Sequence, residues 1–207
     1  MISNSDAHEK VGDRNVFQLL NRNLGYLLCV AMLVYLLGML TYGERFPFWE
    51  KAYSHIGTMR TVSGYPNTLA LLVFGLGMLL SSWICYRSSK MRTSQFDNLC
   101  FIVCSAGYLL LMVPCDLFNA VHSIGGALVF GSLWLFSVIH LNEIHNEKPG
   151  YKFWLYHLIL QGTVLPYAFL YAVKSPADQQ VQKLAFIGLF LTLKLVMNER
   201  VRISNLE

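Results

Sequence analysis

The sequence predicts an all-α integral membrane protein that folds as a bundle of six transmembrane helices. Hydrophobic residues make up 55% of the 207 residues and charged residues only 14%, whereas soluble domains carry about 25% charged residues. The apolar residues gather in six runs, each close to the roughly 20 residues with which a helix crosses the hydrocarbon layer. A chain of this length suffices for one domain and is short for two.

We place the six spans at approximately 24–42, 67–86, 98–114, 123–141, 153–173 and 181–197. Each span must be a helix, because a backbone in lipid has to satisfy its own hydrogen-bonding groups and an isolated strand cannot. Together they form a membrane domain over residues 22–199, with a polar N-terminal segment (1–21) before it and a short tail (200–207) after it. The N-terminal segment is mixed in charge and lacks the apolar core of a secretory signal.

The positions of the basic residues predict the orientation. Six spans leave both termini on one side of the membrane. The terminal segments and the connections 87–97 and 142–152 hold ten Lys and Arg residues, whereas the other three connections hold five. Because basic residues gather on the cytoplasmic side, we expect both termini in the cytoplasm. Nucleic acid is excluded as a partner, since the 16 Lys and Arg residues are scattered singly and form no basic stripe.

The longest outer connection, residues 43–66, predicts a short interfacial helix. On a helical wheel its apolar residues fall on one side and its polar residues on the other. The apolar side consists of Phe48, Trp49, Ala52, Tyr53 and Ile56. We expect this helix to lie on the outer leaflet, anchored by its aromatic rings, and to lead into the second span.

Small residues and cysteines add two expectations about packing. Gly77-xxx-Ser81 and Ala127-xxx-Gly131 predict places where two helices approach closely. Of the five cysteines only Cys115 lies in a loop, and no cysteine–histidine metal spacing accompanies the others. A disulfide framework is therefore not expected.

A polar break between the third and fourth spans, residues 114–126, is the candidate site. It places Asp116, Asn119 and His122 at the outer membrane surface. Asn119 and His122 are three residues apart and so share a face of the fourth helix. Ser54 and His55 lie in the loop at the same membrane face. Polar residues within a membrane domain are costly and mark functional sites, so we expect an outward-facing polar pocket.

Three interpretations of this pocket stay open. In the first, Asp116 orients His122 as a general base for a Ser54 nucleophile, which would make the chain a membrane-embedded hydrolase. In the second, His55, Asp116 and His122 hold a zinc ion whose fourth position carries a water. In the third, Asp116 is the N-cap of the fourth helix and His122 is a satisfied buried histidine.

A haem interpretation uses histidines at both membrane surfaces. His122 and His140 are 18 residues apart, which is five full helical turns, and so share one helix face. With His55 near the outer surface and His157 near the inner surface, they could ligate two haems. The chain would then be a b-type electron-transfer protein.

Further polar residues are candidates for ligand binding. These are His55 and Asn119 in the pocket, Asn67 at the start of the second span, and His157 and Gln161 on the fifth span. His157 and Gln161 are four residues apart and form an inward polar stripe. No carboxylate lies at the centre of any predicted span, which argues against a proton-coupled pump.

Two short motifs carry a resemblance to a known family. The first is the segment 53–58 followed by Asn67 and a glycine-bearing span, and the second is the segment 113–116 followed by His122. Both resemble the bacterial six-helix membrane proteins of the domain of unknown function 998 family, distant relatives of the Frag and DRAM membrane proteins. The matching positions are Ser54, Gly57, Pro114, Asp116 and His122. The resemblance implies six helices in a bacterial inner membrane with both termini inside, and it supplies no reaction.

The sequence therefore predicts a multi-pass membrane protein whose outward-facing polar pocket binds a lipid headgroup or another membrane-soluble molecule. Processing of that molecule, with or without zinc, is an extension of this hypothesis. The alternatives are a non-enzymatic subunit that docks on another membrane protein and the di-haem electron-transfer protein. Membrane lipid is the expected partner in the first case.

Overall fold

The computed structural model describes the backbone of residues 4–91 and 93–204, and the side chains of residues 16–91 and 93–204. The described ranges contain six α-helices, one short 3₁₀ helix and the loops that connect them, and they contain no β-strand. The elements are α1 (Asn4–Thr41), η1 (Tyr53–Gly57), α2 (Thr68–Ser88), α3 (Gln95–Leu111), α4 (Asn119–Glu147), α5 (Tyr151–Ala172) and α6 (Asp178–Ser204). The predicted all-α class is confirmed.

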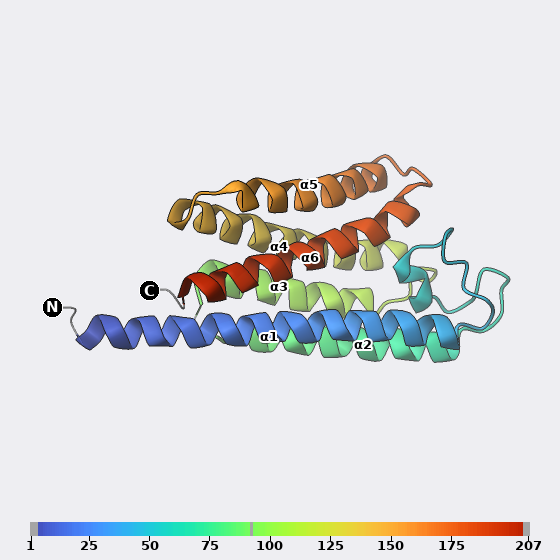
Figure 1. Cartoon of the computed structure of the whole chain (residues 1–207). Coiled ribbons are helices and arrows are strands. Elements are labelled where there is room, and N and C mark those ends of the chain that lie inside the picture. The colour runs from blue at the N-terminus through green and yellow to red at the C-terminus, as the bar shows by residue number, and fades with distance from the viewer. Residues whose placement is uncertain (1–3, 92, 205–207) are drawn as a thin grey trace.

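The six helices run up and down in one bundle (Figure 1). Each packs against its neighbour in the sequence, and α6 also packs against α1 and α4, which closes the bundle. Helix α1 begins and α6 ends at the same end, which we call the terminal end. The opposite end carries η1 and the connection between α1 and α2, and we call it the loop end.

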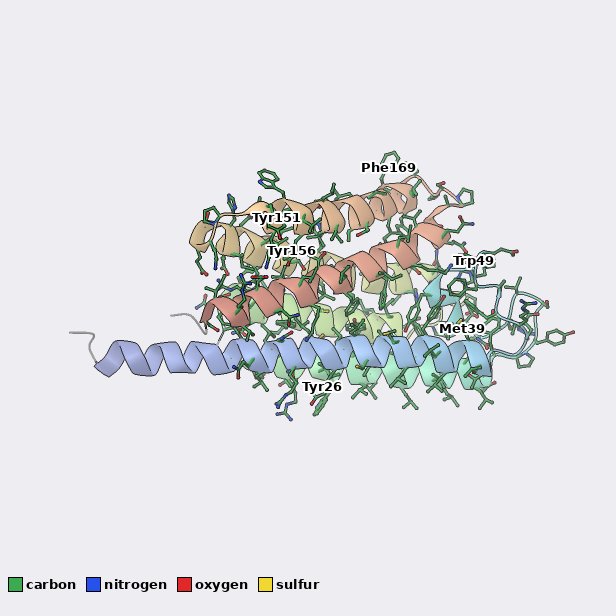
Figure 2. The ribbon with its side chains drawn as sticks, viewed as in Figure 1. Tyr26, Met39, Trp49, Tyr151, Tyr156 and Phe169 are labelled. Atoms are coloured by element: carbon green, nitrogen blue, oxygen red, sulfur yellow. The ribbon has the colours of Figure 1, made fainter. Side chains whose placement is uncertain are left out.

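Five of the described helices are long and apolar enough to cross a membrane, namely α2, α4, α5, α6 and the Val16–Thr41 part of α1. Their outer faces carry large exposed apolar side chains, which suit a lipid environment. Figure 2 shows Tyr26 and Phe169 on opposite outer faces of the bundle. The chain is therefore a multi-pass helical membrane protein.

Helix α3 is shorter than the predicted third span. It has 17 residues and ends at Leu111, whereas the sequence predicted a span to residue 114. Pro114 explains the difference, since the residues just before a proline are disfavoured in the helical conformation. A 17-residue helix is about 25 Å long, at the lower limit for crossing the hydrocarbon layer.

The helix expected on the outer leaflet does not form as predicted. Phe48 begins a turn that ends before Ala52, and the only helix of this connection is the five-residue η1. Ile56 is completely buried. The Tyr53 ring stacks on Phe186 of α6, with 5.5 Å between ring centroids. Ile56 and Tyr53 therefore pack against the bundle, whereas Trp49 stays 78% exposed.

Helices α3 and α4 meet backbone to backbone at two glycines. A Cβ added at Gly125 would lie 2.8 Å from the carbonyl oxygen of Gly107, and one added at Gly107 would lie 2.8 Å from that of Gly125. Gly77 does lie against α1, at Val34, as its motif predicted. Gly131 was predicted wrongly, because an added Cβ there meets nothing within 4 Å.

A charge network with buried His140 and Asp97 side chains links α3, α4 and α6 at the terminal end. His140 Nε2 lies 3.1 Å from Asp97 Oδ1, and His140 Nδ1 lies 2.9 Å from Glu143 Oε2. Arg200 of α6 pairs with Glu143 at 3.2 Å and with Glu147 at 2.6 Å. Because a carboxylate only accepts hydrogen bonds, His140 Nε2 donates to Asp97. The Glu143 carboxylate lies within ion-pair distance of Nδ1 without forming a hydrogen bond to it.

Candidate functional site

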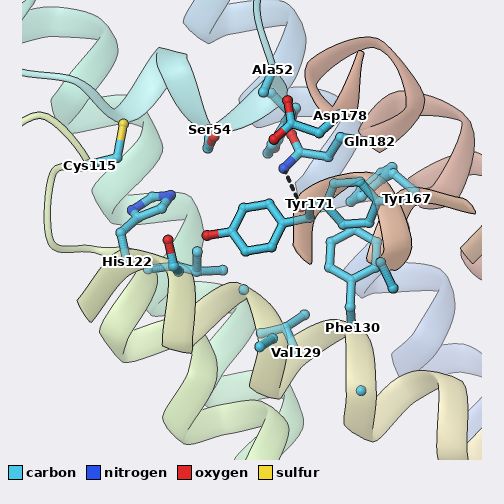
Figure 3. Close-up of a pocket in the computed structure, with 18 of the residues that line it drawn as sticks. Ala52, Ser54, Cys115, His122, Val129, Phe130, Tyr167, Tyr171, Asp178 and Gln182 are labelled. Carbon is cyan, nitrogen blue, oxygen red and sulfur yellow. Dashed lines mark hydrogen bonds between the residues drawn. The ribbon is translucent and has the colours of Figure 1, made fainter. Parts of the chain in front are cut away.

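A cavity of about 670 Å³ opens between the helices near the loop end. Side chains from η1 and from α2, α3, α4, α5 and α6 contribute to its wall. The wall is mainly apolar, and its aromatic rings include those of Phe74, Tyr108, Phe130, Trp134, Tyr171 and Phe186. Figure 3 shows His122 on one side of this cavity and Tyr167 and Gln182 on the other. This size and composition are typical of small-molecule sites.

His122 is the central polar group of the cavity wall. Its side chain belongs to the first turns of α4, and the residue is only 5% exposed. His122 Nδ1 lies 2.8 Å from the carbonyl oxygen of Val113, so Nδ1 carries the proton and donates it to that carbonyl. Nε2 is then an acceptor, and it has no partner within the described part of the chain. The ring stacks on Phe74, with centroids 6.2 Å apart.

Asp116 binds the loop between η1 and α2, and neither caps α4 nor contacts the imidazole of His122. Its carboxylate accepts hydrogen bonds from the backbone N–H of Met59 at 2.9 and 3.0 Å and from that of Arg60 at 3.2 Å. The N-cap of α4 is Phe118, which makes no side-chain capping bond. The capping role predicted for Asp116 is therefore wrong. Val113, and not Asp116, orients the imidazole of His122.

Asn67 and Tyr53 hold η1 in place. Asn67 is 1% exposed, and its Nδ2 donates to the carbonyl oxygens of Ile56 and Thr58, both at 3.0 Å. The Tyr53 hydroxyl donates to the carbonyl oxygen of Ala31 at 2.9 Å. These bonds tie the short helix to α1 and α2. Asn67 was predicted to bind ligand, but it lies outside the cavity wall and positions the loop that carries Ser54 and His55.

The other predicted residues divide between the cavity and the helix contacts. Ser54, His55 and Asn119 line the same cavity as His122. Gln161 accepts a hydrogen bond from Trp134 Nε1 at 2.9 Å and joins α4 to α5 outside the cavity wall. His157 packs edge-on against Phe153, with 4.6 Å between centroids, and is also outside the wall.

The start of α6 supplies polar residues that the sequence analysis did not single out. Asp178, Gln179 and Gln182 line the cavity, and Gln182 Nε2 donates to the Tyr167 hydroxyl at 3.0 Å. The side-chain oxygens of Gln179 and Gln182 have no partner among the described residues. Gln182 follows Asp178 by four residues and Gln179 by three, so the three share a helix face, and this spacing shortly before an apolar run is the signal that could have found them.

The metal and haem hypotheses do not fit the arrangement of these side chains. Within residues 16–91 and 93–204 no three His, Cys, Asp or Glu side chains are placed to hold a metal ion. The Asp116 carboxylate of the predicted zinc set already accepts backbone N–H bonds. Both ring nitrogens of His140, the predicted inner haem ligand, face carboxylates.

His55 is expected to make stability depend on pH. Burial and, to a smaller extent, the charge of Lys51 lower the pKa of its imidazole from 6.5 to about 4. Between pH 4 and 6.5 the unfolded chain therefore binds more protons at His55 than the folded chain. The contribution of His55 to the free energy of unfolding is complete above about pH 6.5 and is lost as the pH falls toward 4. Thermal unfolding in detergent should show this loss, and the His55→Gln variant should show a smaller one. An equal loss in both proteins would contradict the prediction.

No protein-family model, no curated protein and no solved structure matches this chain. The function has to be inferred from the chain's own cavity.

Proposed function

We propose that the chain is a membrane protein whose loop-end cavity binds a largely apolar, membrane-soluble molecule that carries a hydrogen-bond donor. The observation that carries this proposal is His122 Nε2, a buried acceptor without a partner among the described residues, on a side chain that lines an apolar cavity. A buried polar group left unpaired costs about 1–3 kcal/mol. A ligand that donates a hydrogen bond to Nε2 would recover that free energy.

The other polar atoms of the wall favour the same kind of ligand. The unpartnered oxygens of Gln179 and Gln182 are acceptors, and Asp178 adds a carboxylate. Hydroxyl, amide and ammonium groups complement such a set. The aromatic rings can contact an acyl chain or a fused ring system, and they can also lie against a cation. A lipid headgroup with amine or hydroxyl groups fits this description.

The geometry favours binding over hydrolysis. Ser54 and His122 share the cavity, but the carboxylate of Asp116 is held by the backbone of Met59 and Arg60. A serine–histidine pair without an orienting acid is a weaker catalyst than a complete triad. We therefore propose a binding protein. Chemical processing of the bound ligand is a further hypothesis.

The test is to identify what the purified protein retains. Wild-type protein and the variants His122→Phe and His157→Phe are purified from membranes, and organic extracts are analysed by mass spectrometry. We expect one species at near-equimolar amount in wild type and His157→Phe, and at least about tenfold less in His122→Phe, as loss of one buried hydrogen bond implies. His157 is the matched control because it lies outside the cavity wall.

A cavity-filling variant separates binding from folding. Gly131 lines the cavity, and a Cβ added there meets no atom within 4 Å. Gly131→Leu should lose the retained species while its thermal stability stays at the wild-type level. If the variants lose only stability and wild type retains no molecule, the alternative of a non-enzymatic partner subunit is favoured.

We also propose that both termini lie in the cytoplasm and that the membrane is a bacterial inner membrane. The excess of basic residues at the terminal end supports the orientation, and the resemblance to the domain of unknown function 998 family supports the membrane. An alkaline phosphatase fused after Glu207 should be inactive and a fluorescent protein fused there should be bright. The opposite pattern would reverse the orientation.

A further inference from the structure

A groove of about 860 Å³ runs between α1 and α2 near the terminal end, away from the cavity. Its α1 wall includes Leu19, Arg22 and Tyr26, and its other wall includes Trp83, Tyr86 and Arg87 of α2 and Lys90 of the turn after α2. Asn23 Nδ2 donates to Ser88 Oγ at 3.0 Å and holds the two helices together beside it. The groove is therefore formed by two helices that are fixed to each other.

Three cations lie in this groove without a matching acid. Arg22, Arg87 and Lys90 are exposed, and none of them forms an ion pair with an acidic side chain in the described part of the chain. Other cations at the same end behave differently, since Lys152 pairs with Glu199 and Arg200 with Glu147. The groove thus carries a local charge that no described side chain neutralises.

Aromatic rings lie beside two of the cations. The Arg87 guanidinium lies 5.2 Å from the centroid of the Trp83 ring, and Lys90 Nζ lies 5.0 Å from that of Tyr86. Tyr26 is 54% exposed and points away from the bundle (Figure 2). Trp and Tyr at the end of a membrane helix mark the level of the lipid headgroups. The three cations are therefore placed where lipid phosphates lie.

Beyond the groove the surface of α2 becomes apolar toward the centre of the membrane. Exposed leucines continue the same α2 surface beyond Trp83, at Leu76, Leu79 and Leu80. A ligand that fills the whole surface needs an anionic head for the cations and a long apolar part for the leucines. A free phosphate ion satisfies only the first requirement, and a zwitterionic lipid leaves the positive charge of the groove uncompensated.

We propose that this groove binds an anionic phospholipid of the leaflet at the terminal end, with the lipid phosphate between Arg22, Arg87 and Lys90. Basic pockets between membrane helices are suited to such headgroups, and each cation near the surface strengthens the attraction. The bound lipid stabilises the α1–α2 pair from the outside. The site is separate from the loop-end cavity and does not depend on the function of that cavity.

The test is a lipid titration of the delipidated full-length protein in a neutral detergent. Thermal stability and native mass spectra are recorded with phosphatidylglycerol, with phosphatidylcholine of the same acyl chains, and with inorganic phosphate. We expect phosphatidylglycerol to raise the melting temperature and to stay bound at one copy. Replacing all three cations by Gln should weaken its apparent affinity about a hundredfold, or about fivefold for each cation.

The control is Lys148→Gln, which removes one exposed cation at the same end but outside the groove. It should leave the affinity for phosphatidylglycerol unchanged, whereas Arg87→Gln should lower it. Equal stabilisation by phosphatidylcholine, a full effect of inorganic phosphate alone, or an unchanged affinity in the triple variant would each overturn the proposal. Melting temperatures without lipid show whether the triple variant still folds.

Discussion

Replacing His140 by leucine is expected to destabilise the protein by about 3–5 kcal/mol, the usual cost of leaving a buried charge without its partner. The His140 and Asp97 side chains are only 3% and 6% exposed, and they lie 3.1 Å apart. Leucine fills much of the space of the imidazole but leaves the Asp97 carboxylate buried and unpaired. Glu143 is affected less, because it keeps Arg200 at 3.2 Å. Equilibrium unfolding in mixed micelles measures the loss.

A double variant distinguishes the lost charge pair from lost packing. Adding Asp97→Asn to His140→Leu removes the unpaired charge, so a large part of the stability should return. A loss below about 1 kcal/mol in the single variant would show that the pair is not buried as described. No recovery in the double variant would assign the loss to packing around Phe136, whose ring lies 4.3 Å from that of His140.

Replacing Gly125 by alanine is expected to destabilise the α3–α4 contact by about 1–3 kcal/mol, the range found for overpacked sites. The added Cβ would lie 2.8 Å from the Gly107 carbonyl oxygen and 2.8 Å from the Leu111 nitrogen. Both are backbone atoms, so neither can rotate away and the helices must separate. The free energy of unfolding in mixed micelles measures the effect.

The neighbouring glycine is the matched control. A Cβ added at Gly126 meets only Leu111 Cδ2, at 3.9 Å. Gly126→Ala changes helix propensity in the same way as Gly125→Ala, by about 0.5–1 kcal/mol in favour of alanine, but without the clash. It should therefore be neutral or stabilising. Equal effects of the two substitutions would contradict the close crossing.

The architecture could be predicted from the sequence because few backbone structures can cross a lipid bilayer. Apolar runs of sufficient length have to be helices, and the spans predicted at 67–86 and 153–173 lie within two residues of α2 and α5. The third span ended early because Pro114 stops the helix. The α3–α4 crossing was missed because it depends on two glycines that are 18 residues apart in sequence and meet through their backbones.

The candidate site was predicted in part. Placing Ser54, His55, Asn119 and His122 at one membrane face was sufficient to bring them to one cavity. The partners of Asp116 could not be predicted, because its carboxylate accepts hydrogen bonds from backbone N–H groups 56 and 57 residues away. Every residue type except proline has such an N–H group, so no sequence motif identifies it. The partner of His140 could not be predicted either, because Asp97 lies 43 residues away in the sequence.

The most direct test of the central claim is the ¹⁵N NMR spectrum of His122 in the full-length protein, assigned by its loss in His122→Phe. We predict the tautomer with the proton on Nδ1, since that nitrogen lies 2.8 Å from the Val113 carbonyl oxygen. Adding the co-purifying molecule to delipidated protein should shift the Nε2 signal upfield, as expected when its lone pair accepts a hydrogen bond. A proton on Nε2, or an Nε2 signal that the molecule leaves unchanged, would contradict a donor-binding cavity.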